Sequence, residues 1–274
     1  MNIKPLACLA LLAFCGSASS QENADRTTVS FSDPTHPGVL HVGLVTGTIT
    51  VKGRDIKDVI IDTHDRGGNW RFRGRDDDVP PGLHRLPQQP SINVEEQNNR
   101  MTVGSPNVNR FVDLEIQVPL RTSLELSTVN GGDIRVEGVD GELELSNVNG
   151  SISLTGVSGS VVAHTVNGKV TATLTRATPQ KPMAFTSLNG NVDVTLPPAT
   201  KANLKLRTDN GSVFTDFELH MPPRSSGATI EDTRQSGGRY RVEVNKVIYG
   251  SLNGGGADIE LRTFSGNIYV RKAN

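Results

Sequence analysis

The sequence predicts an all-β fold, a parallel β-solenoid of coils of about twenty residues with Asn-Gly corners. Three observations predict it: many glycines with few aromatic residues, an Asn-Gly dipeptide that recurs at a near-constant interval, and apolar residues that alternate on both sides of that dipeptide. Glycine occurs 28 times, aromatic residues make up 4% of the chain, and no long segment has the apolar period of a helix. Short strands joined by turns are therefore expected throughout.

The recurring dipeptide marks the repeat unit. Five corners follow one another at intervals of 18 to 22 residues, and Ser265-Gly266 ends the series; the five begin at Asn130, Asn149, Asn167, Asn189 and Asn210. Apolar residues alternate before each corner, as at Leu124 and Leu126, and after it, as at Ile134 and Val136. Each repeat is thus two strands around a corner, with one apolar face that only stacking on neighbouring repeats can bury.

The position directly before the dipeptide is also apolar, with Asp209 as the exception. The apolar residues there are Val129, Val148, Val166, Leu188 and Phe264. In a solenoid each coil lies about 4.8 Å above the last, so residues of one kind form columns. We expect the corner asparagines, with Ser265, to form an internal ladder that exchanges amide hydrogen bonds, and the adjacent glycines to have positive φ.

An antiparallel arrangement is the alternative to the solenoid. Asn-Gly between alternating strands is the strongest short-range signal for a two-residue hairpin. In a meander or sandwich of hairpins, however, nothing requires the same side chain to recur one full repeat away. The solenoid is therefore favoured over the meander.

Residues 1–20 have the features of a signal peptide. Lys4 precedes an apolar run, Leu6–Phe14, and Ala18-Ser19-Ser20 offers small residues for cleavage. We therefore expect an exported protein, periplasmic or extracellular, and no transmembrane segment in the mature chain.

Both cysteines, Cys8 and Cys15, lie inside this segment. The mature chain therefore forms no disulfide and depends on packing alone in an oxidising compartment. Lipidation at Cys15 is the less favoured alternative, because Phe14 stands where such a site normally has a small residue.

The rest of the chain is expected to form one domain. Residues 21–39 are an N-terminal extension and residues 40–274 the solenoid, in which Val42–Val51 with its Thr46-Gly47 corner is a degenerate coil. Two segments, 64–90 and 222–238, lack periodicity and collect glycine, proline and charge, so we expect exposed excursions there.

Residues 112–170, VDLEIQVPLRTSLELSTVNGGDIRVEGVDGELELSNVNGSISLTGVSGSVVAHTVNGKV, resemble a bacterial "putative adhesin" family of unknown function. Its members are β-strand-repeat proteins related to the head-GIN auto-transporter adhesin domain, and the chain's end, YGSLNGGGADIELRTFSGNIYVRK, is similar to the usual end of that family. The resemblance covers roughly residues 40–274. It implies a right-handed β-helix and supplies no catalytic residues.

No catalytic, cofactor-binding or metal-binding residues are predicted. The acidic residues Asp133, Glu142, Glu144 and Asp193 alternate outward with polar neighbours, as solvated strand faces do, rather than forming the opposed pair of a glycosidase. The histidines lack metal-ligand spacing, and Asp76-Asp77-Asp78 lacks the glycine and glutamate of a calcium loop. A net charge of −1 from well-mixed charges argues against nucleic-acid binding.

One segment is a candidate for partner contact. It contains the only tryptophan in the chain together with arginines, the side chains most enriched at interface anchors: Trp70, Arg71, Phe72, Arg73 and Arg75. An alternative is that Trp70 covers an open edge of the core.

The sequence therefore predicts a non-enzymatic, extracytoplasmic protein with an adhesin-like recognition role or a structural role in the cell envelope. Its partner would be an envelope protein or a glycan. A carbohydrate-active β-helix enzyme, a lyase or hydrolase, is the first alternative, and a regulatory envelope protein that binds a membrane sensor is the second.

Overall fold

The computed structural model describes residues 25–65, 92–106, 111–177, 181–221, 228–232, 240–244 and 247–273. The chain in these ranges consists of strands and turns without a helix. The predicted signal peptide and residues 66–90 of the first predicted excursion, 64–90, lie outside the described residues.

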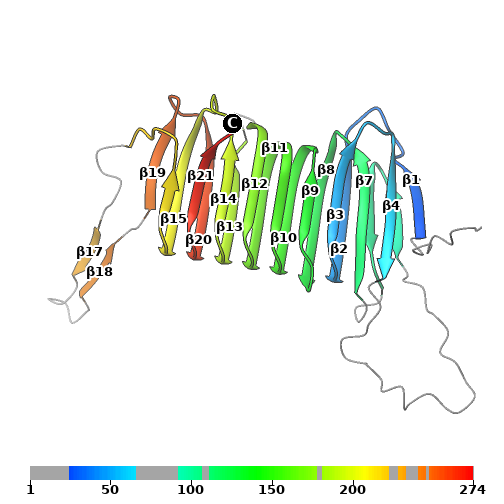
Figure 1. Cartoon of the computed structure of the whole chain (residues 1–274), viewed down its shortest axis with the longest axis horizontal. Coiled ribbons are helices and arrows are strands. Elements are labelled where there is room, and N and C mark those ends of the chain that lie inside the picture. The colour runs from blue at the N-terminus through cyan, green and yellow to red at the C-terminus, as the bar shows by residue number, and fades with distance from the viewer. Residues whose placement is uncertain are drawn as a thin grey trace, which may run out of the picture.

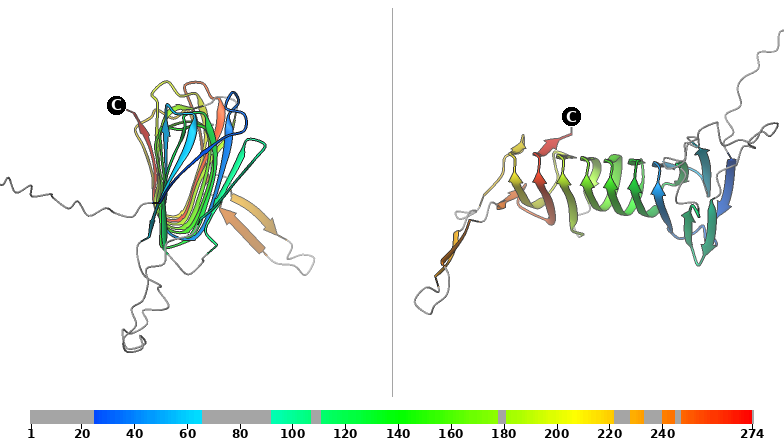
Figure 2. Two further views of the ribbon diagram at one scale, coloured as in Figure 1. Left: turned by 90° about the vertical axis from the view of Figure 1, so that its right-hand side faces the viewer. Right: turned by 90° about the horizontal axis from the view of Figure 1, so that it is seen from below.

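Two sheets face each other along a long axis and enclose the core (Figures 1 and 2). The first sheet contains, in spatial order, β5 (Asn93–Gln97), β6 (Arg100–Gly104), β2 (Gly38–Thr46), β8 (Thr122–Asn130), β10 (Asp140–Asn149), the second half of β11 (Ile152–Asn167), β13 (Met183–Asn189), β20 (Ala257–Ser265), β15 (Ala202–Asn210) and β19 (Val247–Leu252). The second contains β1 (Asp25–Ser30), β4 (Asp58–Asp65), β7 (Val112–Pro119), β3 (Ile49–Arg54), β9 (Ile134–Glu137), the first half of β11, β12 (Val170–Ala177), β14 (Val192–Leu196), β21 (Ile268–Lys272) and β16 (Val213–Thr215). A separate antiparallel pair joins β17 (Ala228–Asp232) to β18 (Tyr240–Val244).

Each coil consists of one strand in the first sheet, a tight corner, and one strand in the second. In the middle of the molecule the coils stack in chain order and their strands pair in parallel. Leu124 is in register with Leu143 of the next coil, and Leu145 is in register with Ala163 of the coil after that. Strand β10 pairs with residues 158–167 rather than folding back on β11 as a hairpin at Asn149-Gly150. The prediction of an all-β solenoid is confirmed.

The alternating apolar residues point inward and are buried. Leu124, Leu145 and Phe185 are no more than 2% exposed and belong to one continuous core that runs the length of the stack. Outward positions in the same strands carry polar side chains, because alternate residues of a strand lie on opposite faces. Each coil of such a stack can bury its apolar face only against the neighbouring coils.

The two ends of the stack depart from chain order. At the C-terminal end, β20 lies between β13 and β15, and β21 lies between β14 and β16, so the last coil of the chain is inserted between two earlier ones. At the N-terminal end, β2 lies between β6 and β8, and β3 lies between β7 and β9. The expectation that each coil lies on the preceding one is therefore wrong at both ends.

Antiparallel strands complete these ends. Strand β4 pairs with β7 and β1 with β4 in the second sheet, whereas β5 pairs with β6 and β19 with β15 in the first. Residues 25–30 of the predicted N-terminal extension thus belong to the sheet. The second predicted excursion, 222–238, contains strand β17, which the missing periodicity did not reveal.

Candidate functional site

The edge with the Asn-Gly corners carries a ladder of amides. The side-chain nitrogen of Asn149 donates to the side-chain oxygen of Asn130 at 3.0 Å, and Asn167 and Asn189 each donate in the same way to the asparagine one coil below at 2.9 Å. Ser265 follows Asn189, and Asn210 follows Ser265, because of the inserted coil. These side chains are exposed on the outside of the corner, so the expectation of an internal ladder is wrong.

A second column lies inside the corner, two residues before each asparagine. Its side chains are buried and donate a hydrogen bond to the carbonyl oxygen of a corner glycine in the adjacent coil, at 2.8 to 3.1 Å; they are Thr128, Asn147, Thr165, Ser187, Thr263 and Thr208. Such bonds satisfy carbonyl groups that the corner takes out of the sheet ladder. The sequence carries a signal for this column, since serine, threonine or asparagine occupies the position in every repeat from Thr128 onward, but residue type alone does not distinguish these side chains from outward polar ones.

The corner glycines have a steric role that the sequence did not suggest. A Cβ atom on Gly168 would lie 2.2 Å from the carbonyl oxygen of Gly150, and one on Gly150 would lie 2.0 Å from that of Gly132. Among the described corners, Gly150 and Gly168 do not have positive φ, whereas the prediction is confirmed at Gly47, Gly131, Gly190 and Gly266. The prediction that positive φ explains these glycines is therefore wrong at both positions, where the close approach of the adjacent coil excludes a side chain.

The apolar position before each asparagine faces outward, although the sequence gives it the character of a core position. Val129 is 40% exposed, Leu188 44% and Phe264 50%. Val45 of the first coil joins the same column, because its neighbours Leu44 and Thr46 are in register with Thr128 and Asn130. An apolar column thus runs beside the amide ladder on the surface.

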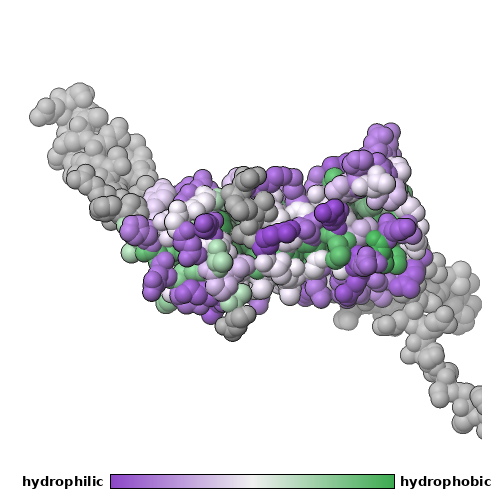
Figure 3. Space-filling model, turned by 90° about the horizontal axis from the view of Figure 1, so that it is seen from above, coloured by the Kyte–Doolittle hydropathy of each residue, from purple (hydrophilic) through white to green (hydrophobic). Residues whose placement is uncertain are grey.

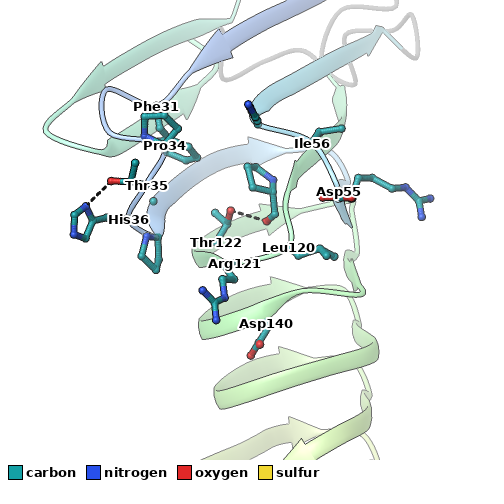
Figure 4. Close-up of a pocket in the computed structure, with 15 residues that line it drawn as sticks. Phe31, Pro34, Thr35, His36, Asp55, Ile56, Leu120, Arg121, Thr122 and Asp140 are labelled. Atoms are coloured by element: carbon teal, nitrogen blue, oxygen red, sulfur yellow. Dashed lines mark hydrogen bonds between the residues drawn. The ribbon is translucent and has the colours of Figure 1, made fainter.

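The opposite edge carries a pocket near the N-terminal end of the stack. Its volume is about 500 Å³, within the range of small-ligand sites. The loop that contains Phe31 and His36 forms one wall, the turn at Asp55-Ile56 forms another, and Leu120 and Thr122 lie between them (Figure 4). Apolar surface gathers at this end of the edge among polar groups (Figure 3), and Leu120 is 45% exposed.

Three cations that line this pocket have no partner among the described residues. Arg54, Lys57 and Arg121 make no hydrogen bond or ion pair with any residue that the structure describes. Asp55 is the one lining carboxylate in the same situation, because Asp140 bonds to Arg176 at 3.1 Å. The pocket therefore has an excess of unpaired positive charge beside an apolar surface, a combination suited to an anionic group on a larger ligand.

The loop that forms the first wall is held by hydrogen bonds to Asp33. The Thr35 hydroxyl, the His36 ring at 2.7 Å and the Thr35 backbone N–H bond this carboxylate and lower its pKa to about 2. The Glu96 carboxylate accepts from the Ser32 hydroxyl and backbone, which lowers the pKa of Glu96 as well. These bonds fix the wall in position without using the pocket's own cations.

The acidic residues considered for catalysis are dispersed and mostly engaged in ion pairs. Asp193 bonds to Arg271 at 2.9 Å, Glu142 pairs with Lys181, and Asp133 accepts from the backbone of Ser151 at 2.9 Å. Glu144 is exposed in the first sheet beside Glu125, the pKa of which is lowered mainly by hydrogen bonds from Arg100. Glu125, Glu142 and Glu144 line one open pocket of about 340 Å³, but all three project from the same face of the adjacent strands β8 and β10.

The remaining candidates are either separated or outside the described ranges. His41 bonds to Glu125 at 3.2 Å and His164 is exposed, and no group of three or more potential metal ligands occurs in the described part of the chain. Trp70, Arg71, Phe72, Arg73, Arg75, His84 and Asp76-Asp77-Asp78 lie outside the described residues, so the predicted partner-contact segment stays a prediction. Within the same part of the chain there is no helix that could cross a membrane.

Comparison with known proteins gives a family and two distant structures. Residues 121–271 match the family model described as Toastrack DUF4097. A "putative cell adhesion protein" from Clostridium sporogenes is 11% identical, covering 91% of this chain and 100% of its own, with a TM-score of 0.47. A "putative adhesin" from Bacteroides fragilis is 11% identical over 92% and 98% of the two chains, with a TM-score of 0.29. No curated protein matches the chain.

Proposed function

The chain belongs to the Toastrack DUF4097 family, and we propose that it is a non-enzymatic, exported recognition protein of the cell envelope. In this proposal it works as an adhesin-like β-solenoid: a rigid stack presents side chains to a partner and performs no chemistry. The observation that carries the proposal is the pocket in which Arg54, Lys57 and Arg121 have no described partner. Cations without a described partner beside an apolar surface are better explained by ligand binding than by a contribution to folding stability, because isolated surface charges stabilise a fold only slightly.

The ligand would carry an anionic group, as an acidic envelope glycan or an acidic protein segment does. Guanidinium groups bind carboxylates through paired hydrogen bonds, each contributing about 1.5 to 3 kcal/mol when charge-assisted. Leu120 and the neighbouring prolines would pack against the apolar part of the ligand. The chain's net charge of −1 is consistent with a local site for an anion rather than with general binding of polyanions.

Export and domain organisation are part of the same proposal. Residues 1–20 would be removed as a signal peptide, residues 25–273 would form one solenoid domain, and the mature chain would work without disulfides in the periplasm or outside the cell. The coils would wind in a right-handed sense, because crossovers between parallel strands of one sheet are right-handed in about 98% of cases.

The proposal is tested with purified residues 21–274 on an array of acidic and neutral glycans and on acidic peptides. We expect retention of acidic ligands only, and a loss of tenfold or more in affinity in the Arg54→Ala/Arg121→Ala variant. Lys201→Ala is the control, since this lysine is exposed on the same edge but does not line the pocket. Equal binding by the double variant and the control would exclude the pocket. Release of reducing ends or unsaturated sugars from polysaccharides would contradict the non-enzymatic role.

A further inference from the structure

Three columns beside the corners form what we call the corner strip; they face outward except at Thr46, which is buried. Each of its five successive rungs contains the corner residue, which is the Asn of Asn-Gly or Thr46, together with the residues one and three positions before it. Phe264 extends the strip by a sixth rung. The rungs are Gly43, Val45 and Thr46; Ser127, Val129 and Asn130; Ser146, Val148 and Asn149; His164, Val166 and Asn167; and Thr186, Leu188 and Asn189. The edge that carries the strip faces the viewer in the right panel of Figure 2.

The composition of the corner strip is unusual for a solvated face. None of its five rungs contains Asp, Glu, Lys or Arg, although these residues make up 21% of the chain. Its central column is aliphatic on every rung, and Val45, Val129 and Leu188 are each at least 40% exposed. Outward positions of a half-buried sheet are normally polar, and a strip that excludes charge while exposing aliphatic side chains has the composition of an interface core.

The spacing of the central column identifies what can pack on it. Its side chains repeat at the rise of one coil, about 4.8 Å, whereas an extended peptide laid along the stack would present side chains on one face every 6.4 to 6.8 Å. Another stack of strands has the same rise and stays in step over the full length. The partner that matches the strip rung by rung is therefore a second β-solenoid.

The sizes of the side chains point to a second copy of this chain. The column has valine at the N-terminal end and in the middle, then Leu188, then Phe264. We propose that two copies pack through their corner strips about a two-fold axis perpendicular to the stack. Val148 then lies opposite Val166 of the other copy, Val129 opposite Leu188, and Val45 opposite Phe264.

This arrangement pairs each large side chain with a small one. A two-fold axis parallel to the stack would instead place Phe264 against Phe264 and Val45 against Val45, which leaves a gap at the valine end. Uneven contact of that kind loses packing energy, because a void deprives its lining atoms of their partners. The perpendicular axis also makes the interface isologous, so that two copies satisfy each other and the assembly is closed.

Charge limits the strip at the C-terminal end. Arg262 flanks Phe264, and on the following rung Arg207 bonds to Asp209 at 3.3 Å. Charged residues at the end of an apolar strip oppose its extension into a larger assembly. The strip offers sixteen residues a side, fewer than the roughly 20 to 30 of a standard interface, so we expect a dimer that dissociates at micromolar concentration.

Sedimentation velocity of purified residues 21–274 across micromolar concentrations tests the proposal. We expect a concentration-dependent dimer, and a monomer for Val166→Lys at every concentration. Val162→Lys is the matched control: the same residue type in the same strand, facing outward, 47% exposed and outside the strip. Unchanged thermal melting of both variants shows that they fold. A monomeric parent protein, or dissociation by the Val162 change as readily as by the Val166 change, would overturn the proposal.

Cross-linking tests the orientation separately, since the mature chain has no cysteine of its own. With the perpendicular axis, the double variant Val129→Cys/Leu188→Cys forms a disulfide between copies, and Val129→Cys alone does not. Within one copy these positions are three rungs apart, beyond the reach of a disulfide. A disulfide dimer of the Val129→Cys single variant would contradict the perpendicular axis.

Discussion

The middle of the solenoid and its two ends are built from similar coils but are connected differently. From β8 to β14 each coil lies on the one before it in the chain, so neighbours in space are neighbours in sequence. At both ends a terminal coil is instead inserted one place inward, between coils that come later or earlier in the chain. Local repetition therefore accounts for the middle, and long-range pairing accounts for the ends.

The difference shows how an open stack can protect its termini. The last strands of a chain fray most easily, and exposed sheet edges invite association. Here β20 and β21 have a paired neighbour on both sides, and β19 covers the outer edge of the first sheet as an antiparallel strand. At the C-terminal end the outer positions are thus given to internal segments, β19 and β16, whereas at the N-terminal end β1, the first described strand, lies at the outer edge of the second sheet.

Removal of residues 257–274 should have the largest effect, because it takes out a rung within the stack rather than at its end. Strand β15 would lose its parallel neighbour, and β16 would lose β21, the one strand that it pairs with among the described residues. We expect amide hydrogen exchange to show loss of protection across 202–215 and 247–252, while 122–177 stays protected. Persistent protection of 202–215 would mean that this coil closes directly on 183–196 and that the insertion is dispensable.

A cavity in the middle of the stack should have the next largest effect. Phe185 is fully buried and in register with Ala163 and Leu261 of the adjacent coils. Phe185→Ala should lower the free energy of unfolding by about 3 to 5 kcal/mol, from lost burial and the void left behind. Urea unfolding measures the change, and Thr186→Ala, an outward neighbour, should stay within about 0.5 kcal/mol of the parent. Similar losses for both would contradict the assigned faces of β13.

The buried column of Thr, Ser and Asn side chains inside the corners offers a smaller change, which should stabilise the protein. Asn147 is the only asparagine in this column; its nitrogen donates to Gly132, whereas its side-chain oxygen is buried without a hydrogen bond in the described structure. Asn147→Thr keeps a donor and removes the unsatisfied oxygen, so we expect a gain of about 1 kcal/mol. Thr165→Val, which removes a donor to Gly150, should destabilise instead. A loss of stability in the Asn147 variant would argue against this role for the column.

Acidification should destabilise the N-terminal end of the stack more than its middle. This is the smallest of the expected effects. Hydrogen bonds lower the pKa values of Asp33, Glu96 and Glu125, all in the N-terminal part of the stack. A lowered carboxyl pKa stabilises the fold above the unfolded value near pH 4, and this contribution is lost as pH falls through the folded value, about 2 for Asp33.

The melting temperature should therefore fall between about pH 4 and pH 2, and less so in Glu96→Gln, which has already lost part of the contribution. Glu144→Gln, an exposed change in the middle, serves as the control and should follow the parent protein. An equal pH dependence in the parent and the Glu96 variant would show that this carboxylate does not hold the end.

The sequence was most informative where structure depends on local alternation. The inward faces of Leu124, Leu126 and the equivalent residues follow from a period of two and were correctly predicted. The stacking order at the ends could not be predicted, because the coil at 257–272 has the same apolar pattern as its neighbours and fits several places equally well. Similarly, the pocket combines turns around residues 36, 55 and 120, which no sequence spacing relates.

The corner shows a different limit. Val129 and Leu188 are apolar, yet they are exposed, because the alternation that places Leu124 and Phe185 inside continues to the corner and puts Val129 and Leu188 on the outer face. Thr128 and Thr165 are polar, yet they lie inside because glycine carbonyls of the adjacent coil accept their hydrogen bonds. Residue type indicates burial reliably only where the backbone meets its own hydrogen-bonding needs.

Disulfide formation between engineered cysteines tests the inserted C-terminal coil most directly. Thr186, Arg262 and Arg207 face outward on three successive rungs, in that order. A disulfide requires Cα atoms within about 7 Å, so it joins adjacent rungs and not rungs about 9.6 Å apart. The pairs Thr186→Cys/Arg262→Cys and Arg262→Cys/Arg207→Cys should therefore oxidise within one molecule, and Thr186→Cys/Arg207→Cys should not. Oxidation of that third pair, with the first staying reduced, would show that the coils stack in chain order.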